Sequence, residues 1–156
     1  MIDPNIPAKS SAVAIPFRQK SSGVSLVILS SIGSYYAVKA FDLWQAHGES
    51  VSEVPGGFLL LAATTLVLVI VVEAVLQTVL AIGAEEVPAP TQQDRDVVRS
   101  AKGVAYGVLA VGVLVTFASL FLGATPFVMA NLALFVFVLA EIAKFATQLY
   151  LYGRSQ

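Results

Sequence analysis

The sequence LVLVIVVEAV, residues 66–75, decides the fold class of this chain. It places a glutamate, Glu73, inside an aliphatic run that extends from about residue 58 to residue 82. A second glutamate, Glu141, has similar surroundings in FVLAEIAKF, residues 137–145. An ionised carboxylate at the centre of a membrane helix costs roughly 2.5–3.5 kcal/mol on insertion scales. Each glutamate is therefore expected to face the protein interior, to have a partner, or to stay protonated.

The composition of the whole chain is typical of an integral membrane protein. Hydrophobic residues make up 57% of the 156 residues and charged residues 12%, and the mean hydropathy is +0.82. Soluble domains contain about 25% charged residues. The net charge of −1 argues against a nucleic-acid partner, which would require a basic face. The absence of cysteine excludes thiol catalysis, disulfides and cysteine-ligated metal.

Four apolar stretches are each long enough, at roughly 20 residues or more, to cross a bilayer as a helix. They cover about residues 23–43, 58–82, 103–122 and 127–151. The predicted fold is an all-α membrane protein with four transmembrane helices in a bundle, residues 23–152, after a flexible cytoplasmic tail, residues 1–22. Matching positions such as Gly23 and Gly103 leave two alternatives open, chance similarity and two tandem helical hairpins related by an axis along the membrane normal.

Most basic residues lie on one side of the predicted membrane, in the tail, the middle loop and the end of the chain. They are Lys9, Arg18, Lys20, Arg95, Arg99, Lys102 and Arg154. The positive-inside rule predicts that both termini and the middle loop are cytoplasmic. Lys39 is an exception, and Asp42, three residues later, is its expected local partner.

Polar residues inside the predicted spans form two small groups that are candidate ligand- or proton-binding residues. Gln77 follows Glu73 by four residues, and Lys144 and Gln148 follow Glu141 by three and seven. If both stripes face inward, Glu73 and Glu141 could meet, with Lys144 neutralising one carboxylate. Two interpretations remain open: a site for a proton, a cation or a polar ligand, and a buried polar network that fixes which helices pack together.

The middle loop carries candidate contacts to lipid or to a partner. Asp94 is a suitable N-cap for the third helix. Arg95, Arg99 and Lys102 follow at helical spacing and form a stripe that can bind lipid phosphates or a cytoplasmic partner. A Gly-x-x-x-Gly pair, Gly103 and Gly107, predicts a close approach either to the first helix or to a second copy of the chain.

Several of these residues resemble a family. The pattern is similar to that of small four-helix prokaryotic membrane proteins of unknown function, which share an acidic–Arg–acidic motif before the third helix. It covers about residues 92–152 and rests on Asp94-Arg95-Asp96, Arg99, Gly103, Tyr106, Gly107, Asn131, Ala140-Glu141-Ile142 and Gln148. Where the family often has acidic residues before the arginine, this chain has Gln92 and Gln93. The resemblance implies a multi-pass protein of the prokaryotic cytoplasmic membrane, and it implies no activity.

Enzyme signatures are missing from the sequence, so no catalytic residues and no cofactor are predicted. The only histidine, His47, has no second histidine or cysteine with which to hold a transition metal tightly. The predicted function is that of a non-enzymatic structural or regulatory membrane bundle. We expect it to contact the lipid bilayer and to form a homo-oligomer or bind a membrane or cytoplasmic protein. The alternative is a small proton- or cation-coupled transporter, or a polar-ligand-binding protein, that uses Glu73 and Glu141.

Overall fold

Four helices account for nearly all of the chain that the structure describes. The computed structural model describes residues 17–47, 56–82 and 91–154, without the side chains of residues 17, 18, 47, 56, 72, 73, 76, 77 and 79–82. The helices are α1 (Phe17–His47), α2 (Gly56–Ile82), α3 (Gln92–Phe121) and α4 (Pro126–Arg154). The prediction of an all-α chain with four helices is confirmed. Residues 1–16, which make up most of the predicted tail, lie outside the described residues.

Three of the helices are long and apolar enough to cross a membrane. These are α1 over Gln19–Ala46, α3 over Gln92–Phe121 and α4 over Pro126–Arg154. In α2, the part described with its side chains contributes a shorter apolar stretch, Gly57–Val71. The chain is therefore a helical protein with at least three segments suited to a bilayer. This agrees with the prediction of a membrane protein by length and composition.

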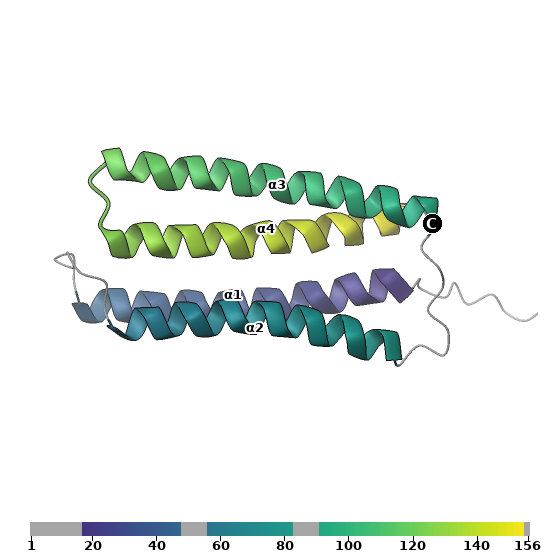
Figure 1. The fold of residues 1–156 in the computed structure, drawn as a ribbon, viewed down its shortest axis with the longest axis horizontal. Helices are drawn as coiled ribbons and strands as arrows, with labels where there is room; N and C mark the ends of the chain where they lie inside the picture. Colours follow the sequence, from purple (N-terminus) through teal and green to yellow (C-terminus); the bar gives the residue numbers. More distant parts are fainter. Residues whose placement is uncertain (1–16, 48–55, 83–90, 155–156) are drawn as a thin grey trace, which may run out of the picture.

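The helices lie in the order α3, α4, α1, α2, so that the two central helices come from different hairpins (Figure 1). In the described residues α4 packs along both α3 and α1, and α1 packs along α2. Of the two alternatives for the Gly-x-x-x-Gly pair, packing of the first helix along the third is not found among the described residues, where α4 packs along both. A twofold axis along the membrane normal would exchange α1 with α3 and α2 with α4, and would require α2 to pack along α3 as α4 packs along α1. No such packing is found among the described residues, and the relation of the two halves by that axis stays a prediction.

The core lies between α1, α2 and α4 in two clusters. Near the end of the molecule where α1 finishes, Tyr36, Phe58 and Phe127 are buried together with Ala40 and Leu134, and the rings of Phe58 and Phe127 meet edge to face. Closer to the other end, the cluster consists of Leu29, Ile32, Val69 and Phe145. These clusters hold three helices together, whereas α3, in the described residues, packs along α4.

Local sequence signals fix the ends of α3 and the start of α4. Thr91 is the N-cap of α3 and forms a capping box with Asp94. At the other end Gly123 adopts a positive φ of 77°, and the amide of Ala124 donates to the carbonyl of Ser119, as in a Schellman motif. Pro126 then opens α4, where its fixed φ and missing amide proton are well tolerated.

Two expectations about these boundaries are corrected. The N-cap of α3 is Thr91, and Asp94 is the third helical residue, because the Thr91 hydroxyl accepts a hydrogen bond from the Asp94 amide. Residues 17–22, predicted as part of the tail, belong to α1, and two of them, Ser21 and Ser22, are buried. These serines lower the local hydropathy although they pack inside the protein.

Candidate functional site

Lys144 and Glu141 form an ion pair within α4. The Lys144 ammonium donates a hydrogen bond to the Glu141 carboxylate across one helical turn, as the spacing of three allows. Both side chains are largely removed from the surface, with 15% of Lys144 and 21% of Glu141 exposed. The ammonium also lies over the ring of Phe145, 4.5 Å from its centroid, a geometry suited to a cation–π contact. The carboxylate of Glu141 therefore has a counter-charge on its own helix.

Gln148, two turns from Glu141, links α4 to the first turns of α1. The hydroxyl of Ser22 donates to the side-chain carbonyl of Gln148 over 2.9 Å, and both residues are buried. Ser25, one turn further along α1, is only 2% exposed, and its hydroxyl has no hydrogen-bond partner among the described residues. This end of the α1–α4 contact is therefore polar, and one buried hydroxyl in it is not satisfied by the described side chains.

Glu73 and Gln77 lie in α2, but their side chains are outside the described part of the structure. Whether Glu73 meets Glu141 therefore stays a prediction. The backbone gives position 73 a definite place on the helix: it follows Val69 by one turn and Thr65 by two, and both of those residues are buried.

The depth of the ion pair follows from the register of α3 and α4. The Tyr152 hydroxyl donates to the Asp94 carboxylate over 3.1 Å, which sets these two residues level with each other. Lys102 follows Asp94 by eight residues along α3. Lys144 precedes Tyr152 by eight residues along α4. Because the helices are antiparallel, Lys144 lies level with Lys102, the last cation of the α3 stripe, and Glu141 lies about 4.5 Å further along the axis. The pair therefore lies in the half of the bundle near its basic end, which we define by Lys20, Arg95, Arg99, Lys102 and Arg154.

A second polar contact joins α1 and α4 toward the opposite end. Tyr36 is completely buried, and its hydroxyl donates to the side-chain carbonyl of Asn131 over 2.7 Å. The amide of Asn131 in turn donates to the carbonyl of Phe127, one turn earlier, over 2.8 Å. From the sequence, Asn131 was named only through the family resemblance, and Tyr36 was missed. The one available signal was that Tyr36 and Asn131 are polar residues inside their apolar segments.

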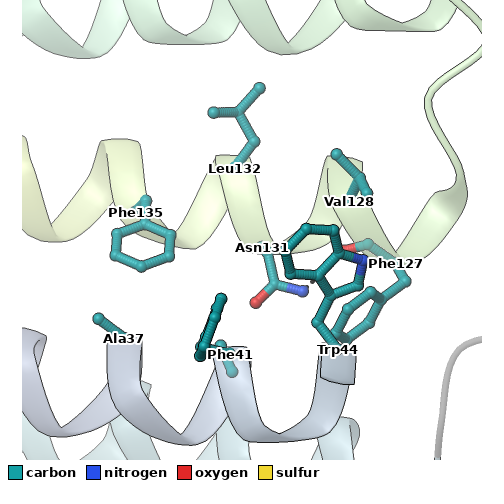
Figure 2. A pocket seen from close by; sticks show the side chains of 9 residues that line it. Ala37, Phe41, Trp44, Phe127, Val128, Asn131, Leu132 and Phe135 are labelled. Atoms are coloured by element: carbon teal, nitrogen blue, oxygen red, sulfur yellow. Dashed lines mark hydrogen bonds between the residues drawn. The ribbon is translucent and has the colours of Figure 1, made fainter. Parts of the chain in front are cut away.

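Beside this contact lies an apolar groove of about 350 Å³ between α1 and α4 (Figure 2). Trp44 and Phe127 lie close to the Asn131 side chain in this view, and Phe41 lies on the α1 side. Apart from Asn131, whose amide oxygen and nitrogen are both hydrogen-bonded, and the indole N–H of Trp44, the lining is apolar. The groove is therefore suited to an apolar group. Its lining residues are Ala37, Ala40, Phe41, Trp44, Phe127, Val128, Asn131, Leu132 and Phe135.

The cationic stripe of α3 lies at the surface. Arg95, Arg99 and Lys102 are all exposed, so the structure leaves them accessible as the predicted lipid or partner contacts. The predicted pair of Lys39 and Asp42 is confirmed as an exposed contact of 3.4 Å. Gly103 and Gly107, predicted to allow a close helix approach, have open space where a side chain would begin. Instead Gly112 supports the close contact of α3 with α4, at Val136.

Comparison with protein-family models, with curated proteins and with solved structures found no match to this chain. The family resemblance of residues 92–152 therefore stays a prediction.

Proposed function

We propose that this protein is a non-enzymatic membrane bundle with a structural or regulatory role, whose polar side chains within the spans hold its helices together. The observation that carries the proposal is the pairing of these side chains inside the chain. Glu141 pairs with Lys144, Gln148 with Ser22, and Asn131 with Tyr36. Two of these contacts join α1 to α4, at two levels of the bundle. Interhelical hydrogen bonds of this kind stabilise membrane helix pairs.

In the proposed setting, the basic end faces the cytoplasm of a prokaryotic cell. The exposed cations Lys20, Arg95, Arg99, Lys102 and Arg154 support this orientation, because cytoplasmic segments carry the excess of Lys and Arg. Both termini would then be cytoplasmic. The open helix order, in which α2 and α3 do not pack along each other, leaves surface on the central helices that a second copy or another membrane protein would cover. We therefore propose that the bundle works in an oligomer or with a protein partner.

A second candidate function is a proton- or cation-coupled carrier, or a protein that binds a polar ligand, through Glu73 and Glu141. The buried hydroxyl of Ser25, which has no partner among the described residues, favours it. Ser25 lies one turn from Ser22 on the α1 face that carries the contact to Gln148. A ligand or a chain of water molecules at that place would satisfy the hydroxyl and could reach the Glu141–Lys144 pair.

One experiment separates the two functions. The full chain is purified in detergent, and its thermal unfolding midpoint is measured from pH 5 to pH 9, with and without added sodium or potassium, beside the variants Glu73→Gln, Glu141→Gln and Lys144→Gln. The structural role predicts that Glu141→Gln and Lys144→Gln lower the midpoint at every pH, and that added cation has no effect. A wild-type midpoint that rises with one cation or shifts with pH, together with glutamine variants that lose this response, would instead support the carrier.

A further inference from the structure

One face of α3 carries two kinds of exposed side chain in a defined order. A helix turns about 100° per residue, and by this geometry six exposed residues fall within a sector of roughly 60°. From the basic end toward the other end they are Arg95, Arg99, Lys102, Tyr106, Phe117 and Leu120. The face therefore changes from cationic to aromatic to apolar along the helix axis. α4 packs on the other side of α3, through Val97, Ala101 and Gly112.

None of the three cations forms an ion pair with a described side chain. The ion pairs formed between described side chains are Lys39–Asp42 and Glu141–Lys144, and neither includes the α3 stripe. The two acids nearest the stripe are turned away from it and have other contacts. Asp94 lies about 100° to one side of Arg95 and accepts from Thr91 and Tyr152. Asp96 lies about 100° to the other side and accepts from Gln92. The stripe thus presents positive charge that the described part of the chain leaves uncompensated.

Beyond the cations the face fits the acyl region of a bilayer. Tyr106 is 73% exposed and Phe117 64% exposed, and the axial distance from Tyr106 to Leu120 is about 21 Å. Next to the stripe, Gly103 and Gly107 leave open space, since no neighbouring atom lies within 4 Å of the place where a Cβ would stand. A tyrosine between charged and apolar residues is typical of the membrane–water interface. Cationic, aromatic and apolar groups therefore follow one another in the order of a lipid's phosphate, glycerol region and acyl chain.

We propose that the outward face of α3 is a binding site for one anionic phospholipid. Its phosphate lies between Arg95, Arg99 and Lys102, and its acyl chain runs past Tyr106 and the open space at Gly103 and Gly107. Charge complementarity selects the anionic headgroup, because each cation near a membrane surface attracts anionic lipid. The exposed apolar residues beyond the cations distinguish this site from one for free phosphate or for an acidic protein segment. Neither of those ligands would cover Phe117.

The test is a lipid titration of the full chain in detergent, followed by native mass spectrometry. Phosphatidylglycerol and phosphatidylcholine with identical acyl chains are added in equal amounts. The proposal predicts a retained phosphatidylglycerol adduct of one molecule per chain. The double variant Arg99→Gln/Lys102→Gln should weaken its binding about 30-fold, on the scale by which surface cations attract anionic lipid. Circular dichroism confirms that the variant keeps its helix content.

The control is Lys20→Gln/Arg154→Gln, which removes the same charge at the same end of the molecule from α1 and α4. It should leave phosphatidylglycerol binding within about twofold of wild type. Equal binding of the two lipids would overturn the proposal, and so would equal weakening by the control pair, which would indicate a general charge effect. Displacement of the lipid by millimolar glycerol phosphate would also overturn it, because the headgroup alone would then be the ligand.

Discussion

Gly112 of α3 and Val136 of α4 are packed against each other with no room for a side chain on the glycine. A Cβ at Gly112 would stand 2.1 Å from Cγ1 and 2.8 Å from Cβ of Val136. The stiff, branched valine cannot swing aside, because its side chain has few allowed rotamers and its own Cβ is part of the clash. This contact sets the distance between α3 and α4, and α4 is the helix that fixes α3 to the rest of the protein.

Gly112→Ala is therefore expected to destabilise the protein by about 1–3 kcal/mol, the usual cost of forcing an extra methyl group into a packed contact. Gly107→Ala on the same helix is the matched control, because its new methyl group meets open space. Unfolding in mixed micelles, followed by circular dichroism, measures both. Equal stability of the two variants would contradict the packing described for α3 and α4.

Tyr36→Phe should lower the free energy of unfolding by about 0.6–1.7 kcal/mol, the range of interhelical hydrogen bonds in membrane proteins. The substitution keeps the ring, which meets Phe135 edge to face, and removes only the donor to Asn131. Tyr35 is exposed, so Tyr35→Phe should have almost no effect. A double-mutant cycle with Asn131→Leu tests the pairing directly, and a coupling energy near zero would show that the hydrogen bond adds nothing.

Ser22→Ala should weaken the contact of α1 with α4 near the basic end. It removes the donor to Gln148, and we expect a loss of about 0.6 kcal/mol or more because the acceptor stays buried. Ser31→Ala is the control, since the Ser31 hydroxyl is exposed and bonds only to the carbonyl of Val27 on its own helix. Comparison of their unfolding midpoints distinguishes the interhelical role from a general effect of removing a serine.

Thr91→Ala should destabilise the first turn of α3 by about 1 kcal/mol, since it removes the side-chain oxygen that accepts from the Asp94 amide. Thr91→Ser retains that oxygen and should restore most of the loss. Hydrogen exchange at residues 92–96 is the suitable measurement, because the effect is local to the helix start. Faster exchange in the alanine variant alone is the expected result, and equal exchange in all three proteins would mean that the cap is unimportant.

The sequence predicted where the four helices lie along the chain, but it did not predict which helices pack against each other. Apolar runs bounded by Pro, Gly and charged residues located all four helices, although α1 and α3 begin earlier than the predicted spans, at Phe17 and Gln92. Those first turns carry serines and charged side chains, so hydropathy places them outside the membrane segment. Helix packing depends on the shapes of the helix surfaces, such as the close contact of Gly112 with Val136. The helices are apolar on nearly all sides, so the periodicity of the sequence does not show which side faces a neighbour.

The candidate site was predicted in part. The spacing of three between Glu141 and Lys144 was visible in the sequence, and the pair forms within α4. The partners of Gln148 and Asn131 lie on α1, more than ninety residues away along the chain, so local spacing could not identify Ser22 or Tyr36.

The contact between α1 and α4 also has a consequence for biosynthesis. The ribosome makes α1 first and α4 last, so this contact joins the two ends of the helical region. Until α4 has been made, Ser22 of α1 lacks its partner Gln148, and Tyr36 lacks its partner Asn131. A nascent chain that stalls before α4 therefore displays polar groups that the finished protein conceals. Membrane quality-control proteases would recognise such a chain as incomplete, so removal of α4 should shorten the lifetime of the whole product in the cell.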